Sequence, residues 1–106
     1  LRGIFRPWLL AGFLAPDDVA LVMASQAAFA RAFATGSAAV EGVPDRVLDA
    51  LVDHVTLCGG TDELPALVAR LRRLGDAGLD GVALRLYADP AASIRLIGRA
   101  VVPALA

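Results

Sequence analysis

Two short stretches of the sequence carry residues whose types and spacing suit the binding of an anion. The first is the turn Gly59-Gly60-Thr61, which directly precedes a helix signal at Asp62-Glu63. Backbone N–H groups at the start of a helix point outward and attract negative charge, so this turn is a candidate binding site for an anion such as a cofactor phosphate. The alternative is a tight turn followed by a helix N-cap, because a lone Gly-Gly pair has low specificity.

The second stretch holds Arg85 and Tyr87, which alternate with Ala83 along a β-prone run. Residues two apart on a strand point to the same face, so both side chains would reach one end of that strand together. A guanidinium there could hold an anionic group of a substrate or cofactor. The alternative role for Arg85 is an ion pair with Asp89 or with an acid further upstream.

The remaining reactive side chains do not form a catalytic group. Cys58 and His54 stand at opposite ends of one short β-prone run, so they cannot act as a nucleophile and its base. We expect Cys58 to be buried in a strand and His54 to be a capping or surface group. One cysteine and one histidine are too few for a structural zinc site, and no catalytic residue is identified within the 106 residues.

The composition indicates that further protein, outside these 106 residues, covers part of the apolar surface of this chain. Of its residues 58% are apolar and 20% are charged, against about 45–50% and about 25% in globular chains. A net charge of -1 leaves no positive field for nucleic acid. No apolar run approaches the roughly 20 residues of a membrane span, so we expect a cytoplasmic protein. The chain starts at Leu1, not at a methionine, which suggests an internal residue of a longer protein.

The order of expected elements predicts an α/β fold. Apolar runs bounded by turn signals predict strands over 8–14, 55–58 and 81–86, and helical spacing with capping signals predicts helices over 17–33, 44–55, 61–74 and 89–105. Trp8, Phe29 and Phe33 are expected in the core. Strands that alternate with helices form a parallel sheet, and three strands are too few for a closed domain. Residues 1–106 are therefore predicted to be a single C-terminal segment, without a second domain and incomplete at its N-terminus: the last three β/α units of a (β/α)8 TIM barrel.

Three stretches resemble the C-terminal end of the luciferase-like monooxygenases. They are LCGGTDE at 57–63, LVARL at 67–71 and GDAGLDGVAL at 75–84, and Pro44-Asp45 also fits the family pattern. In that family a Gly-Thr pair opens the penultimate helix and an Ala-Gly-hydrophobic-Asp tetrad leads into the last barrel strand. The resemblance covers about Val43 to Leu105, and Asp62 departs from it where the family more often has proline.

The resemblance implies an enzyme that binds FMN or the deazaflavin coenzyme F-420 and transfers hydride or activates oxygen on a small-molecule substrate. Its implied partner is the remainder of the barrel, with a homodimer as a further possibility. On this interpretation the segment alone is inactive, Gly59, Gly60 and Thr61 bind the cofactor, and Arg85 and Tyr87 bind the substrate. The alternative is a self-contained, non-catalytic α/β interaction module that dimerises through its apolar face.

Overall fold

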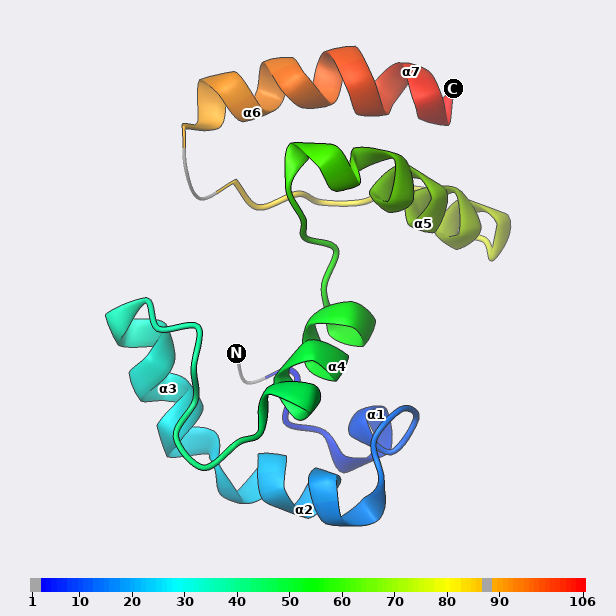
Figure 1. The fold of residues 1–106 in the computed structure, drawn as a ribbon. Coiled ribbons are helices and arrows are strands. Elements are labelled where there is room, and N and C mark those ends of the chain that lie inside the picture. The colour runs from blue at the N-terminus through cyan, green and yellow to red at the C-terminus, as the bar shows by residue number, and fades with distance from the viewer. Residues whose placement is uncertain (1–2, 87–88) are drawn as a thin grey trace. The chain divides into compact units, whose positions relative to one another are not determined.

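All regular structure in the described part of the chain is helical. The computed structural model describes residues 3–86 and 89–106 (Figure 1), and helices account for 65% of these residues, with no strand or sheet among them. The predicted α/β fold and the TIM barrel are therefore wrong for the described structure. The chain divides into two compact units, Leu1–Leu57 and Cys58–Ala106, which we call the N-terminal unit and the C-terminal unit.

The N-terminal unit contains α1 (Pro7–Leu10), α2 (Pro16–Ala24), α3 (Gln26–Thr35) and α4 (Asp45–Val55). Prolines stand at or just before the first residue of three of them, where a missing N–H costs nothing because the first turn has no intrahelical acceptor. Gly36 ends α3 with φ 66°, a left-handed conformation that glycine adopts without strain.

The core of this unit draws on every one of these four helices. Its buried cluster consists of Leu10, Val22, Phe29, Val43, Val47 and Leu51. The ring of Phe5 meets Phe29 edge to face, with centroids 5.4 Å apart. Such a cluster joins positions that lie up to 41 residues apart in sequence, so it depends on tertiary packing.

Two sequence predictions for the N-terminal unit need correction. The run 8–14 is no strand, because Pro7 starts the short helix α1, and Trp8 is 76% exposed instead of buried. The predicted helix over 17–33 is divided at Ser25, whose hydroxyl donates to the Leu21 carbonyl at 2.7 Å. That bond competes with regular helical pairing. Within α3, Phe29 is buried as predicted, whereas Phe33 is 65% exposed instead of part of the core.

The C-terminal unit contains η1 (Thr61–Glu63), α5 (Leu64–Asp76), α6 (Pro90–Leu96), η2 (Ile97–Val101) and α7 (Val102–Leu105). The last three follow one another without a break, and α5 packs against η2 and α7. Val68 of α5 and Val101 of η2 are the buried apolar residues of the described part of this unit.

The helix that ends the chain widens into a π-helix over Ile97–Val101. The N–H of Val102 donates to the carbonyl of Ile97, five residues earlier. Pro103 explains this position, because proline has no N–H for the carbonyl four residues back and its ring crowds that carbonyl in a regular α-helix. The wider turn lets the helix continue through Pro103 to Leu105.

The two later predicted strands are also absent from the described structure. Residues 56–60 and 79–86 have neither helix nor strand, and Val55 belongs to α4. A strand requires a second extended segment for its backbone hydrogen bonds, and β-prone composition alone does not supply one. That residues 1–106 form one segment of a larger domain stays a prediction.

Candidate functional site

The Gly59-Gly60-Thr61 turn lies at the exposed start of the C-terminal unit. Gly60 has an extended backbone with φ -75° and ψ 175°, and its N–H donates to the Glu63 carboxylate at 2.7 Å. The Glu63 N–H in turn donates to the Gly60 carbonyl at 3.1 Å. Two N–H donors of this turn, those of Gly60 and Glu63, are thus already bonded within the turn.

Two carboxylates crowd this turn. A Cβ placed on Gly60 would lie 2.6 Å from an Asp62 carboxylate oxygen, and one placed on Gly59 would lie 2.7 Å from a Glu63 oxygen. An external phosphate would have to displace Glu63 and would also meet the negative charge of Asp62. As described, the turn caps its helix and does not by itself fit an anionic cofactor group.

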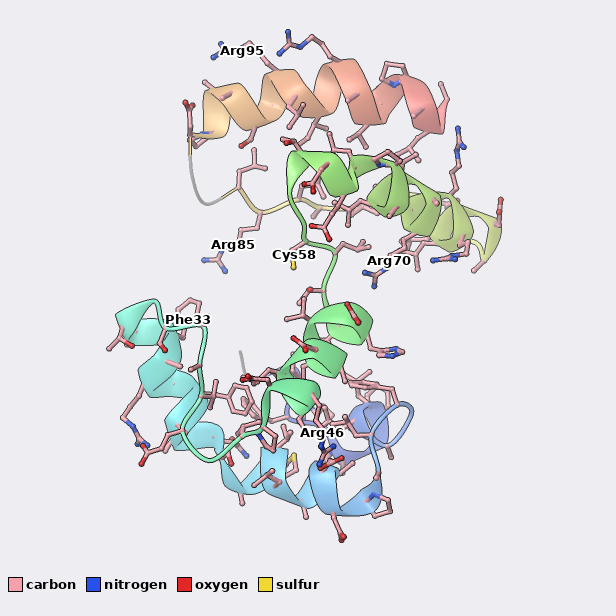
Figure 2. The ribbon with its side chains drawn as sticks, viewed as in Figure 1. Phe33, Arg46, Cys58, Arg70, Arg85 and Arg95 are labelled. Atoms are coloured by element: carbon pink, nitrogen blue, oxygen red, sulfur yellow. The ribbon has the colours of Figure 1, made fainter. Side chains whose placement is uncertain are left out.

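Arg85 is exposed within the irregular segment 79–86, and its guanidinium extends away from α6 (Figure 2). Tyr87, its predicted partner in substrate binding, lies outside the described residues. Asp89, the acid considered as an ion-pair partner for Arg85, accepts the Ala92 N–H at 3.0 Å and so caps α6. Arg85 and the glycine turn belong to the same unit, the C-terminal one.

Cys58 departs from the sequence prediction, whereas His54 is a surface group as predicted. Cys58 is exposed at the start of the C-terminal unit instead of buried in a strand, because no strand forms around it. His54 is exposed in the last turn of α4, as a surface group, and its ring stacks on Phe13 with centroids 4.6 Å apart and planes at 13°. The sequence contains no signal for that pairing, since α2, α3 and most of α4 lie between the two residues.

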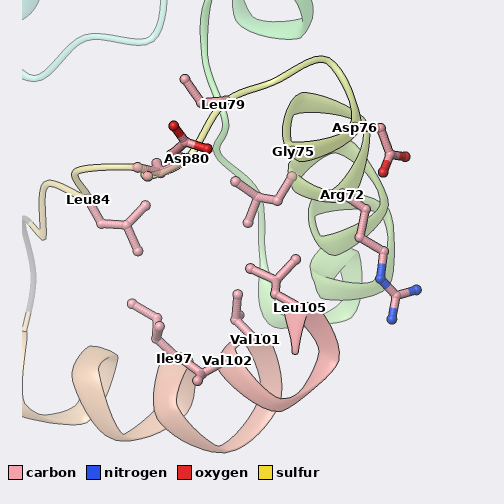
Figure 3. A pocket seen from close by; sticks show the side chains of 13 residues that line it. Arg72, Gly75, Asp76, Leu79, Asp80, Leu84, Ile97, Val101, Val102 and Leu105 are labelled. Carbon is pink, nitrogen blue, oxygen red and sulfur yellow. The ribbon is translucent and has the colours of Figure 1, made fainter.

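The C-terminal unit contains an apolar pocket that the sequence did not reveal. Its volume is about 640 Å³, within the range of small-molecule sites. The apolar side chains of Leu84, Ile97 and Val101 point into it, whereas Arg72 and Asp76 point away (Figure 3). The lining residues are Leu71, Arg72, Gly75, Asp76, Leu79, Asp80, Gly81, Val82, Leu84, Ile97, Val101, Val102 and Leu105.

Most side chains that line this pocket are apolar. The described residues that line it include no histidine, cysteine, serine or tyrosine, and its ionisable side chains are Arg72, Asp76 and Asp80. The nearest cation, Arg72, donates from Nε to the Ala104 carbonyl at 3.0 Å and so joins α5 to α7. Among the sequence predictions, those of helices over 61–74 and 89–105 relate to this pocket, because both helices line it.

An ion pair with two hydrogen bonds joins two helices of the N-terminal unit. The Arg46 guanidinium donates to both carboxylate oxygens of Asp18, at 2.7 and 2.8 Å, and links the start of α4 to the first turn of α2. These hydrogen bonds lower the pKa of Asp18 below its usual value and raise the pKa of Arg46. The pair holds α2 and α4 together.

The described residues also limit other kinds of site. Among them, no three histidine, cysteine or acidic side chains are grouped so that they could hold a metal ion. None of the described helices has both the length and the apolar character needed to cross a bilayer. Comparison of the chain with protein-family models, curated proteins and solved structures finds no match.

Proposed function

We propose that this chain is part of a flavin- or deazaflavin-dependent oxidoreductase of the luciferase-like class, acting in the cytoplasm. The observation that carries the proposal is the pair of runs LCGGTDE at 57–63 and GDAGLDGVAL at 75–84, which flank the helix α5. The bound cofactor, FMN or coenzyme F-420, would supply the hydride or oxygen chemistry. The proposal concerns activity alone, because the helical fold of the described residues differs from the fold that the resemblance implies.

The chain's own part in such an enzyme is packing and not catalysis. Leu79, Val82 and Leu84 are each about half exposed, and Ile94 is 62% exposed. Exposed apolar side chains favour burial against another protein surface when they are grouped, as Leu79, Val82 and Leu84 are around the pocket. We infer that the remainder of the enzyme covers them and supplies the groups that act on a small-molecule substrate.

Absorption spectroscopy of the whole enzyme that contains this chain tests the proposal. A bound flavin or deazaflavin gives a visible spectrum, and the two cofactors differ in the position of their bands. We expect the purified enzyme to carry one of them or to bind it when it is added. A folded enzyme that binds neither FMN nor coenzyme F-420 would contradict the proposal.

A pair of variants at Gly60 tests whether the turn binds the cofactor phosphate. Gly60→Pro removes the N–H donor, and the φ of -75° suits proline. Gly60→Ala keeps the donor and only requires the flexible end of Asp62 to move. Weaker cofactor binding in the proline variant than in the alanine variant supports a site here, whereas equal affinities exclude the Gly60 N–H as a ligand.

Arg85→Ala in the whole enzyme tests the predicted substrate contact, with Arg95→Ala as its control. Both arginines are exposed and both project from the C-terminal unit (Figure 2). We expect a raised substrate KM, or weaker cofactor binding, for the Arg85 variant only. Unchanged cofactor affinity and unchanged KM in both variants would remove Arg85 from the site.

A second candidate function is a non-catalytic helical interaction module that forms a homodimer. The exposure of Trp8 (76%) and Phe33 (65%) in the N-terminal unit favours it, because large aromatic side chains are enriched at protein interfaces. Sedimentation of the protein and of Phe33→Gln tests it, with Arg31→Gln on the same helix as control. A dimer that only Phe33→Gln dissociates supports the module, and a monomer at all concentrations excludes it.

A further inference from the structure

We draw no further inference here: the strongest candidate, the apolar pocket of the C-terminal unit between α5, residues 79–84 and the helix that ends at Leu105, has no polar side chain pointing into it that would identify a ligand, and nothing in the structure shows what covers it.

Discussion

The two units of the chain bury their apolar residues to very different extents. Of the ten buried apolar residues in the described chain, eight lie in the N-terminal unit, and the C-terminal unit contributes only Val68 and Val101. Conversely, seven of the eleven exposed large hydrophobic residues lie in the C-terminal unit. Both units are rich in apolar residues, so composition does not explain the difference.

The arrangement of the helices does explain it. In the N-terminal unit four helices contribute side chains to one cluster, so residues such as Val22 and Val47 are enclosed from several directions. In the C-terminal unit α5 packs against η2 and α7, which belong to one continuous helix, and two packed helices enclose fewer side chains than four. An apolar stripe becomes a core only when enough elements converge on it.

The largest expected effect comes from Leu10→Ala in the N-terminal unit. Leu10 is fully buried, and a buried leucine truncated to alanine loses about 2–5 kcal/mol of unfolding free energy. We expect amide hydrogen exchange, measured by mass spectrometry on the intact chain, to speed up across α2, α3 and α4. Leu84→Ala is the matched control, because Leu84 is 51% exposed and its loss should cost no more than about 0.5 kcal/mol. Equal effects of the two variants would show that the units do not differ in burial.

A smaller effect is expected from Val101→Ala in the C-terminal unit. The removed methyl groups correspond to about 1.5 kcal/mol of apolar burial, because Val101 is only 7% exposed. Val102→Ala, one residue later and 57% exposed, is the control and should be nearly neutral. Loss of exchange protection in α5 should follow Val101→Ala alone, and protection that is unchanged in both variants would mean that the C-terminal unit has no core at all.

Arg72→Met should weaken the contact between α5 and the end of the chain. Methionine keeps an unbranched apolar stem but removes the donors to the Ala104 carbonyl, one of the last carbonyls of the helix. We expect a loss of about 1 kcal/mol or less, seen as faster exchange at residues 101–105. Arg73→Met, at the exposed neighbouring position of α5, should leave that exchange unchanged, and an identical response of both variants would contradict the Arg72 contact.

The smallest effect concerns the pH dependence of the N-terminal unit. The folded-state pKa of Asp18 lies below its usual value of 3.8 because Arg46 donates to its carboxylate. The contribution to stability is therefore present above pH 3.8 and is lost as the pH falls through the lower, folded-state pKa. Urea unfolding at pH 7 and at pH 2 to 3 measures this contribution. We expect Asp18→Asn to reduce the difference in unfolding free energy between the two pH values. Asp17→Asn keeps the Arg46 bonds to Asp18 and is the control, because it should reduce that difference in unfolding free energy less than Asp18→Asn does.

Local sequence signals predicted most helices of the chain. Pro44-Asp45 marks the start of α4, Thr61 opens η1 and α5, and Asp89-Pro90 opens the helix that runs to Leu105. Prolines in a first turn and acidic caps act on neighbouring residues only, so they can be read without the fold.

The strands were mispredicted because pairing is not a local property. The run 81–86 is rich in β-prone residues, but a strand exists only when a second segment accepts and donates its hydrogen bonds.

The prediction of the candidate site also depended on contacts that the sequence does not show. The sequence identified an exposed glycine turn before a helix, but the 2.7 Å bond from Gly60 to Glu63, which occupies the donor, became visible only with side chains in place.

By itself, the sequence determined where most helices begin and that the chain holds more apolar residues than its own interior can bury. These properties follow from capping, helical periodicity and composition, which act over a few residues. Tertiary structure alone decided that Val47 is enclosed while Ile94 is exposed, and that residues 79–86 remain without a partner strand. Burial and strand pairing depend on which distant segments meet, and that information is not contained in any single stretch of the chain.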